Sequence, residues 1–138
     1  MNHTIEKSER YALIRLAEAN FTGEIPATFE TTSRSLFRES YSNLIVDLAS
    51  TKTIDGAGLI AIKRINRQCS NELGILVLVT KDDDMLEALA GANIADLTIM
   101  PSLEEAIDAV FLHELENDFS AGDDQYDGEL GDGTDSAI

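Results

Sequence analysis

Residues 44–69 read LIVDLASTKTIDGAGLIAIKRINRQC and set out a strand, a glycine-containing turn and a helix, in that order. The run over residues 44–48 is apolar and rich in β-branched residues, which is typical of a strand buried on both faces. After the turn, small and apolar residues recur at helical spacing, at Gly58, Ile62, Ile65 and Cys69. This spacing predicts the buried face of an amphipathic helix, so the stretch as a whole predicts an α/β fold.

Further strands and helices alternate on both sides of this stretch. Upstream, residues 5–7 and 11–16 predict a short strand pair, and Pro26 lies in the first turn of a helix that continues toward Glu39. Downstream we expect strands over residues 73–79 and 97–100, a helix over residues 82–90 between them, and a last helix toward Leu115 that Ser102-Leu-Glu-Glu105 opens as a capping box. This alternation predicts a parallel or mixed sheet with helices packed against it.

The composition describes one domain of ordinary hydrophobicity. The chain has 138 residues, of which 43% are hydrophobic. The single cysteine cannot form an internal disulfide, and no apolar run approaches the ~18 residues that would span a bilayer, so we expect a cytoplasmic protein. The net charge of −16 disfavours binding to nucleic acid or to an anionic membrane. The expected partners are therefore proteins or small molecules.

The acidic charge is concentrated at the C-terminal end. From Glu114 to Ile138 the chain carries nine Asp and Glu residues and no Lys or Arg. The last segment is also rich in Gly, Asp and Ser and lacks periodicity, so it cannot bury enough apolar surface to offset the entropy of ordering. We expect a folded domain over residues 1–116 and a disordered acidic tail over residues 117–138. A faint calcium-loop pattern from Asp123 onward is a minor alternative for the tail.

The glycine-containing turn has some features of two phosphate-binding motifs but lacks others. It has neither the Lys nor the Ser or Thr of a Walker loop, so nucleotide hydrolysis is not expected. Gly56, Gly58 and Ala61 satisfy the spacing of a dinucleotide fingerprint, and Asp82 lies at about its acidic position. However, seven residues separate the strand from Gly56, whereas the fingerprint's first glycine should follow its strand directly. Dinucleotide binding stays a minor alternative.

No set of residues has the spacing of a catalytic or metal site. A receiver-like magnesium site at Asp47 and Asp82 would need an acidic pair after the first strand, where Glu18 stands alone. We therefore expect Asp47 to bond loop amides and the acidic run from Asp82 to cap a helix. His3 and His113 have no Cys or second His at ligand spacing. We expect no metal, no cofactor and no enzymatic activity, with phosphoryl transfer onto Asp47 as the enzymatic alternative.

The order and spacing of these features over roughly residues 5–115 resembles the STAS domain family of anti-sigma factor antagonists. The shared features are a buried strand with a late Asp, then Asp55 followed by two small residues, Gly58-Leu59 at the start of a helix, and a later helix opened by Ser102. The resemblance implies a small mixed sheet with helices mainly on one face. It also implies a noncatalytic regulator of bacterial transcription that works by partner switching, binding an anti-sigma factor or a switch-type serine kinase. An accessory subunit of a transport or ligand-sensing system is the alternative.

The resemblance also locates a departure from the family. Gly56 and Ala57 stand where the family has a small pair whose Ser or Thr is phosphorylated, and neither side chain carries a hydroxyl group. Ala57 is the position equivalent to the phosphoacceptor, so the resemblance implies a regulator without the usual loop phosphoserine. Ser50, Thr51 and Thr53 lie just upstream and are possible displaced phosphosites.

The helix after the turn carries a basic stripe, which we define as Lys63, Arg64 and Arg67. Helical spacing places this stripe, together with Ile60, opposite the buried face. The stripe holds three of the ten basic residues of a strongly acidic chain. We therefore expect a partner-binding surface made of the turn and the exposed side of the helix: Asp55, Gly56, Ala57, Gly58, Ile60, Lys63, Arg64 and Arg67.

Overall fold

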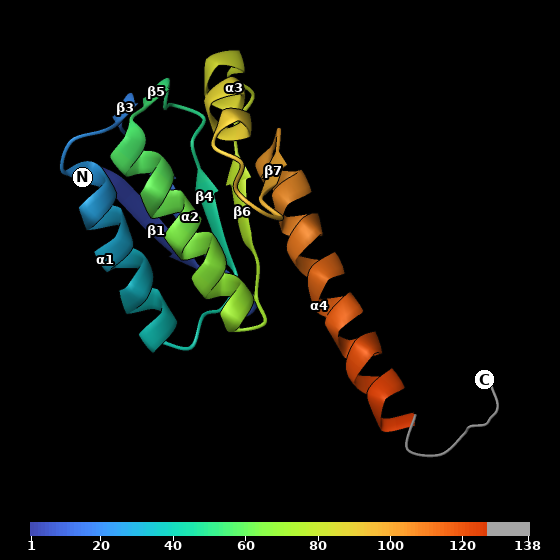
Figure 1. The fold of residues 1–138 in the computed structure, drawn as a ribbon. Helices are drawn as coiled ribbons and strands as arrows, with labels where there is room; N and C mark the ends of the chain where they lie inside the picture. The colour runs from blue at the N-terminus through green and yellow to red at the C-terminus, as the bar shows by residue number, and fades with distance from the viewer. Residues whose placement is uncertain (127–138) are drawn as a thin grey trace.

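A computed structural model describes the backbone of residues 1–126 and the side chains as far as Asp118. Its centre is a five-stranded sheet with the order β1-β2-β4-β6-β7 (Figure 1). The first strand is antiparallel to the second, and the other three neighbouring pairs are parallel. The prediction of a mixed sheet is confirmed. The strands are β1 (His3–Lys7), β2 (Ala12–Leu16), β4 (Leu44–Asp47), β6 (Leu76–Val79) and β7 (Thr98–Met100).

The helices cover the two faces of the sheet unequally. Three of them, α1 (Ile25–Arg38), α2 (Gly56–Asn71) and α3 (Asp83–Gly91), contribute to the core on one face (Figure 1). The fourth, α4 (Leu103–Tyr126), covers the other face. Successive strand residues serve opposite faces, so Val46 packs toward α2 while Ile45 packs toward α4. The prediction of helices mainly on one face is confirmed.

The start of β6 was predicted too early. Residues 73–79 were expected to form the strand, but β6 begins at Leu76 and Leu73 is 78% exposed. Residues 72–74 instead end α2, because the Gly74 amide donates to the Cys69 carbonyl at 2.7 Å and Leu73 adopts a φ of 64°. This is the hydrogen bond of a Schellman-type helix end, which places a left-handed residue where a strand was predicted.

A second, two-stranded sheet has no counterpart in the sequence prediction. It pairs β3 (Asn20–Phe21) with β5 (Thr53–Ile54) in parallel. Strands of two residues are too short to show an alternating pattern, so the sequence could not predict them from periodicity. Their pairing joins the segment before α1 to the loop before α2.

The last helix is longer than predicted. Its start agrees with the capping-box prediction, because the Glu105 amide donates to Ser102 Oγ at 3.2 Å. However, α4 continues to Tyr126, so the predicted boundary between residues 116 and 117 falls inside a helix. Residues 127–138 of the predicted tail lie outside the described residues, and so do the side chains of the calcium-loop pattern.

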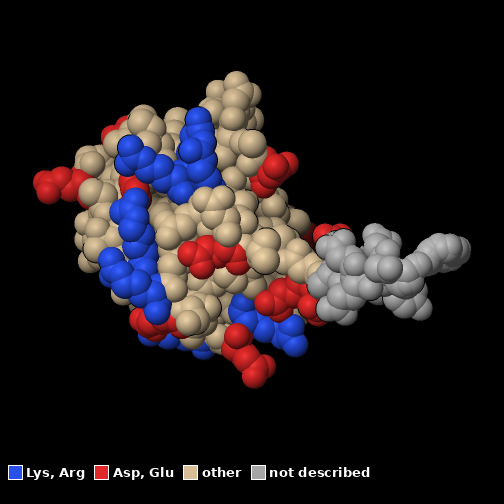
Figure 2. Space-filling view, turned by 60° about the horizontal axis from the view of Figure 1, so that its bottom comes forward, with Lys and Arg blue, Asp and Glu red and all other residues tan. Residues whose placement is uncertain are grey.

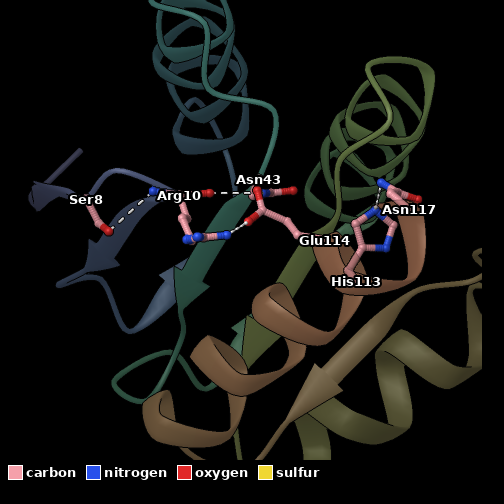
Figure 3. A network of polar contacts seen from close by, with 6 residues as sticks. All are labelled: Ser8, Arg10, Asn43, His113, Glu114 and Asn117. Carbon is pink, nitrogen blue, oxygen red and sulfur yellow. Dashed lines mark hydrogen bonds and ion pairs between the residues drawn. The ribbon is translucent and has the colours of Figure 1, made fainter. Parts of the chain in front are cut away.

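Polar contacts fasten the middle of α4 to the end of the sheet (Figure 3). The side chain of Asn43, only 2% exposed, donates to the Arg10 carbonyl and to Glu114 Oε2, both at 2.9 Å. Its oxygen accepts from the Ile75 amide at 3.1 Å. The Glu114 carboxylate also pairs with the Arg10 guanidinium at 2.7 Å. One buried amide thus connects the β1–β2 turn, the starts of β4 and β6, and α4.

Candidate functional site

Asp55 fixes the turn before α2. One carboxylate oxygen accepts from the Gly58 amide at 2.9 Å and caps the helix, and the other accepts from the Gly23 amide at 3.2 Å. These hydrogen bonds, the one from Gly58 first, lower the pKa of the Asp55 carboxyl below its ordinary value because they favour the charged form. Asp55 therefore joins the loop before α1 to the N-terminus of α2.

The loop between β4 and α2 is tied to the segment before α1 by a series of hydrogen bonds. The Lys52 amide donates to the Ala19 carbonyl at 2.7 Å, and the paired strands β3 and β5 follow. Thr51 Oγ1 donates to the Glu18 carbonyl at 2.8 Å, and Thr53 Oγ1 donates to the Asn20 side chain at 2.6 Å. The loop is thus held in place along the segment that precedes the turn.

The three small residues that begin α2 have different surroundings. Gly56 and Ala57 are exposed, whereas Gly58 is buried. A Cβ atom on Gly58 would lie 2.6 Å from the Phe21 carbonyl oxygen and 2.6 Å from Ile54 Cγ1, so only glycine fits there without a shift. Gly56 has no atom within 4 Å of such a Cβ. The first helical turn therefore presents a small, uncharged surface at Gly56 and Ala57, whose amides precede the first hydrogen-bonded amides of the helix, those of Gly58 and Leu59.

The three upstream hydroxyl groups differ in access. Thr51 is fully buried and its hydroxyl group is bonded to the backbone, so a kinase could reach it only if the loop opened. Thr53 is exposed, but its hydroxyl group is bonded to Asn20. Ser50 is exposed and lines a shallow hollow with Asp47. Of the three, Ser50 is the most accessible as a displaced phosphosite.

The buried and exposed sides of α2 agree with the helical spacing in the sequence. Ile62, Ile65 and Cys69 are fully buried. The basic stripe is exposed on the other side, next to Ile60, which is 49% exposed. The predicted surface residues are therefore brought together along one turn and one helix side, starting at the Asp55 cap, except Gly58, which is buried against Phe21 and Ile54 and presents no surface to a partner.

The structure extends the basic surface onto α1, which the sequence prediction missed. Arg34 and Arg64 both contact the carboxylate of Glu30, at 2.7 and 3.4 Å, so the exposed sides of α1 and α2 meet there. Arg38 lies one helical turn after Arg34 and is also exposed. The spacing of four residues was a visible signal on α1, but nothing in the sequence placed α1 beside α2.

Lys and Arg side chains are unevenly distributed over the surface. Figure 2 shows them gathered in a band along one side of the face in view, with acidic side chains around it. Five of the ten basic residues belong to the exposed sides of α1 and α2. In a chain with a net charge of −16, this clustering makes one face locally suited to an acidic partner. The five are Arg34, Arg38, Lys63, Arg64 and Arg67.

The carboxylates of the two candidate acidic sites, Asp47 and Asp82, form hydrogen bonds with nearby backbone amides. Asp47 accepts from the Ala49 amide at 3.0 Å and lies 3.5 Å from the Arg15 guanidinium. Asp82 caps α3 through the Met85 amide at 3.0 Å, and this bond is the main cause of its lowered pKa. Both findings confirm the predicted local roles. Among residues 1–118, no three His, Cys, Asp or Glu side chains are grouped so that they could hold a metal ion.

The strand order bears on the dinucleotide alternative. The strands of the five-stranded sheet follow one another across it in chain order. A dinucleotide-binding fold places its ligand where the strand order reverses, and the described sheet has no such reversal. Gly56, Gly58 and Ala61 therefore match that fingerprint in spacing alone.

Comparison with known proteins places this architecture in a family. The family model described as STAS domain matches residues 2–106. No curated protein matches the chain. Among the solved structures, the anti-sigma factor antagonist SpoIIAA in its unphosphorylated form matches with a TM-score of 0.64 and 19% identity, over 79% of this chain and 97% of SpoIIAA. An anti-sigma factor antagonist from Mycobacterium paratuberculosis matches with a TM-score of 0.69 and 14% identity, over 79% and 92% of the two chains.

A third similar structure comes from a different class of protein. A murine Solute Carrier 26 family anion transporter in the inward-facing state matches with a TM-score of 0.64 and 10% identity, over 78% of this chain and 18% of the transporter. Within residues 1–126, no helix has the length and apolarity needed to cross a membrane. Such low identities show a shared fold, and the family match covers most of the sequence. The chain belongs to the STAS domain family.

Proposed function

We propose that this protein is a noncatalytic anti-sigma factor antagonist, which binds an anti-sigma factor or a switch-type serine kinase through the turn at Asp55 and the exposed side of α2. SpoIIAA, which has the same fold, is an anti-sigma factor antagonist with a named unphosphorylated form. The observation that carries the proposal is the site itself. A capped helix N-terminus with exposed Gly56 and Ala57 leads directly into the basic stripe.

The proposed surface acts without a loop phosphoserine. A phosphate on residue 57 would add about −1.5 to −2 charges and considerable bulk at the start of α2. The helix dipole and the free amides would stabilise that phosphate within this chain, so its cost would fall on a partner docked against it. With Ala57 in this position, the surface keeps the small, uncharged form. We therefore infer that partner binding is constitutive and insensitive to a kinase that acts at this turn.

The basic residues have separate parts in the proposed surface. Arg64 already contacts Glu30, a side chain that is mostly buried, so its replacement would perturb the packing of α1 on α2. Lys63 and Arg67 are exposed on the same helix side. Rim charges act mainly through the association rate and its salt dependence. Arg67 is therefore the cleaner position for testing the contribution of the stripe to binding.

The alternative is an accessory STAS subunit of a transport or ligand-sensing system. Its support is the anion transporter with a similar fold, and at 10% identity this likeness extends to the fold alone. The two functions differ in the partner that is captured. An accessory subunit binds a transporter component and none of the anti-sigma factors of the same organism.

The test is a titration of each anti-sigma factor kinase encoded in the source genome, purified singly, against this protein by calorimetry. We expect one of them to bind the wild type. Ala57→Glu and Arg67→Glu should each weaken binding by about tenfold or more, since like charge and desolvation at an interface cost several kcal/mol. Ala90→Glu and Lys81→Glu are matched controls at exposed positions outside the surface. Equal affinities of all four variants and the wild type would remove this surface from the interface.

A further inference from the structure

Helix α4 has an apolar side that the sheet does not use. Its contacts with the sheet are made by residues such as Ala106 and Val110, which are fully buried. Three large apolar side chains on α4 are exposed instead: Phe111 by 46%, Leu112 by 56% and Leu115 by 53%. They are half of the six large exposed apolar residues found in the described part of the chain. Such a concentration is typical of an interaction surface.

The exposed side of α4 borders a groove along the edge of the sheet. The groove has a volume of about 420 Å³, and its apolar lining is Ile75, Met100, Ala109 and Leu112. It runs between α4 and β7, which is the edge strand. The Arg10 guanidinium carbon lies 5.6 Å from the centroid of the Phe111 ring, so Phe111 has a partner within the chain. Leu112 lines the groove, and Leu115 lies one turn further along α4.

The groove has an acidic rim. Glu105, Asp108 and Glu116 line it together with the apolar residues. Over residues 103–118, α4 carries six Asp and Glu residues and no Lys or Arg. Of these six, Glu114 is paired with Arg10 on the other side of α4 from β7. An apolar floor with an acidic rim complements an apolar stripe flanked by cations, and it repels nucleic acid and anionic lipid.

The charge also argues against a second copy of this chain as the occupant. Two copies that paired through this groove would bring their acidic rims together, in a protein with a net charge of −16. An amphipathic helix is the protein segment that presents apolar residues on one side with charges along the edges of that side. The residues of α4 that line the groove extend from Glu105 to Glu116, about three helical turns, so a helix can lie along it.

We propose that the groove between α4 and β7 is a docking site for an amphipathic helix of a partner protein, one whose apolar stripe is flanked by Lys and Arg. This site lies on the face of the sheet opposite α2, because α4 and α2 pack on two different core clusters on the two faces. It does not depend on the function proposed for the α2 surface. A partner bound here leaves the turn at Asp55 free, so the protein can hold two partners at once.

The test uses a fluorescein-labelled peptide of Leu and Lys, about 16 residues long, arranged so that Leu falls on one helix side. Its binding to the full chain is measured by fluorescence anisotropy. A peptide of the same composition in scrambled order is the control for charge alone. Leu112→Ser and Leu115→Ser remove apolar contact without changing charge, and Ile60→Ser does the same at a similarly exposed position on α2. Circular dichroism establishes that each variant is folded.

We expect saturable binding of the ordered peptide and binding weaker by about tenfold for the scrambled one, for Leu112→Ser and for Leu115→Ser. Ile60→Ser should bind like the wild type. Asp108→Asn combined with Glu116→Gln should weaken binding and reduce its dependence on salt. The proposal is overturned if the scrambled peptide binds equally well, if both Leu variants bind like the wild type, or if Ile60→Ser loses as much affinity as they do. It is also overturned if sedimentation shows a wild-type dimer that Leu112→Ser disperses, because the occupant is then a second copy.

Discussion

Replacement of Gly58 by alanine should destabilise the fold at the start of α2. The added Cβ atom would lie 2.6 Å from the Phe21 carbonyl oxygen, 2.6 Å from Ile54 Cγ1 and 2.8 Å from Phe21 Cδ2. The Phe21 ring has little room to move, because it is fully buried and packs edge-on against Phe29 at 5.3 Å between centroids. The carbonyl oxygen belongs to β3, which is paired with β5. The backbone of the turn must therefore shift to admit the methyl group.

The magnitude follows from two opposing effects. Overpacking of a well-packed site costs about 1–3 kcal/mol of unfolding free energy. Alanine in place of glycine in a helix returns about 1 kcal/mol. The net loss for Gly58→Ala is therefore about 0–2 kcal/mol, and its central value of about 1 kcal/mol lowers Tm by roughly 3–5 °C for a domain of this size.

The matched control is Gly56→Ala, two residues earlier in the same turn. A Cβ atom on Gly56 has no neighbour within 4 Å, so this variant should be as stable as the wild type or more stable by up to about 1 kcal/mol. Both variants are measured by urea and thermal denaturation followed by circular dichroism. If Gly58→Ala proves as stable as Gly56→Ala, the close approach of α2 to Phe21 does not constrain the turn.

Three further predictions concern acid stability, the cysteine and the C-terminal end. The pKa values of Asp55 and Asp82 are lowered in the folded state, chiefly by the amides of Gly58 and Met85, from an ordinary value of 3.8. Their stabilisation is therefore present above about pH 4 and is lost as the pH falls through the lowered folded values. Urea unfolding at a series of acidic pH values should show a shallower loss for Asp55→Asn, and an unchanged slope contradicts this assignment. Burial raises the pKa of Cys69 to about 12. The thiol should therefore react with Ellman's reagent only when urea unfolds the chain, and a fast reaction in native buffer would contradict its burial. Removal of residues 127–138 should leave Tm nearly unchanged, whereas a drop of many degrees would mean that this segment packs on the domain.

The elements that could be predicted from the sequence are those in which the pattern of apolar residues matches the pattern of burial. The apolar run at residues 44–48 became β4, and the spacing from Gly58 to Cys69 gave the correct buried side of α2. The prediction of the start of β6 was wrong because Leu73 is apolar but follows the end of α2 in a left-handed conformation. Its apolar character looked like the beginning of a strand, while the helix end depended on a hydrogen bond from Gly74.

The residues of the candidate site that are consecutive in the sequence could be predicted, but those contributed by a second helix could not. The turn at Asp55 and the basic stripe are consecutive in sequence, so helical spacing was enough to place them together. The arginines of α1 join them because α1 packs beside α2, where Glu30 contacts both Arg34 and Arg64. The outward apolar side of α4 was hidden for a related reason. Its exposed leucines follow the buried residues Ala106 and Val110 along the same helix, and only the packed sheet shows which apolar residues the core uses.

The shape of the turn and the chemical character of its exposed position, residue 57, depend on different residues. The shape depends on residues to either side, because Asp55 accepts from the Gly23 and Gly58 amides and Gly58 lies against Phe21. Ala57 is exposed between them. A change at residue 57 therefore alters the charge and bulk of the surface, while the frame of the turn, meaning the hydrogen bonds of Asp55 and the contact of Gly58 with Phe21, stays in place. Under the proposed function, Ala57→Glu should reduce partner affinity at an unchanged Tm, whereas Gly58→Ala should reduce Tm as well. A parallel fall of affinity and Tm in Ala57→Glu would show that residue 57 helps to hold the frame, and the loss of binding could then no longer be assigned to charge at the interface.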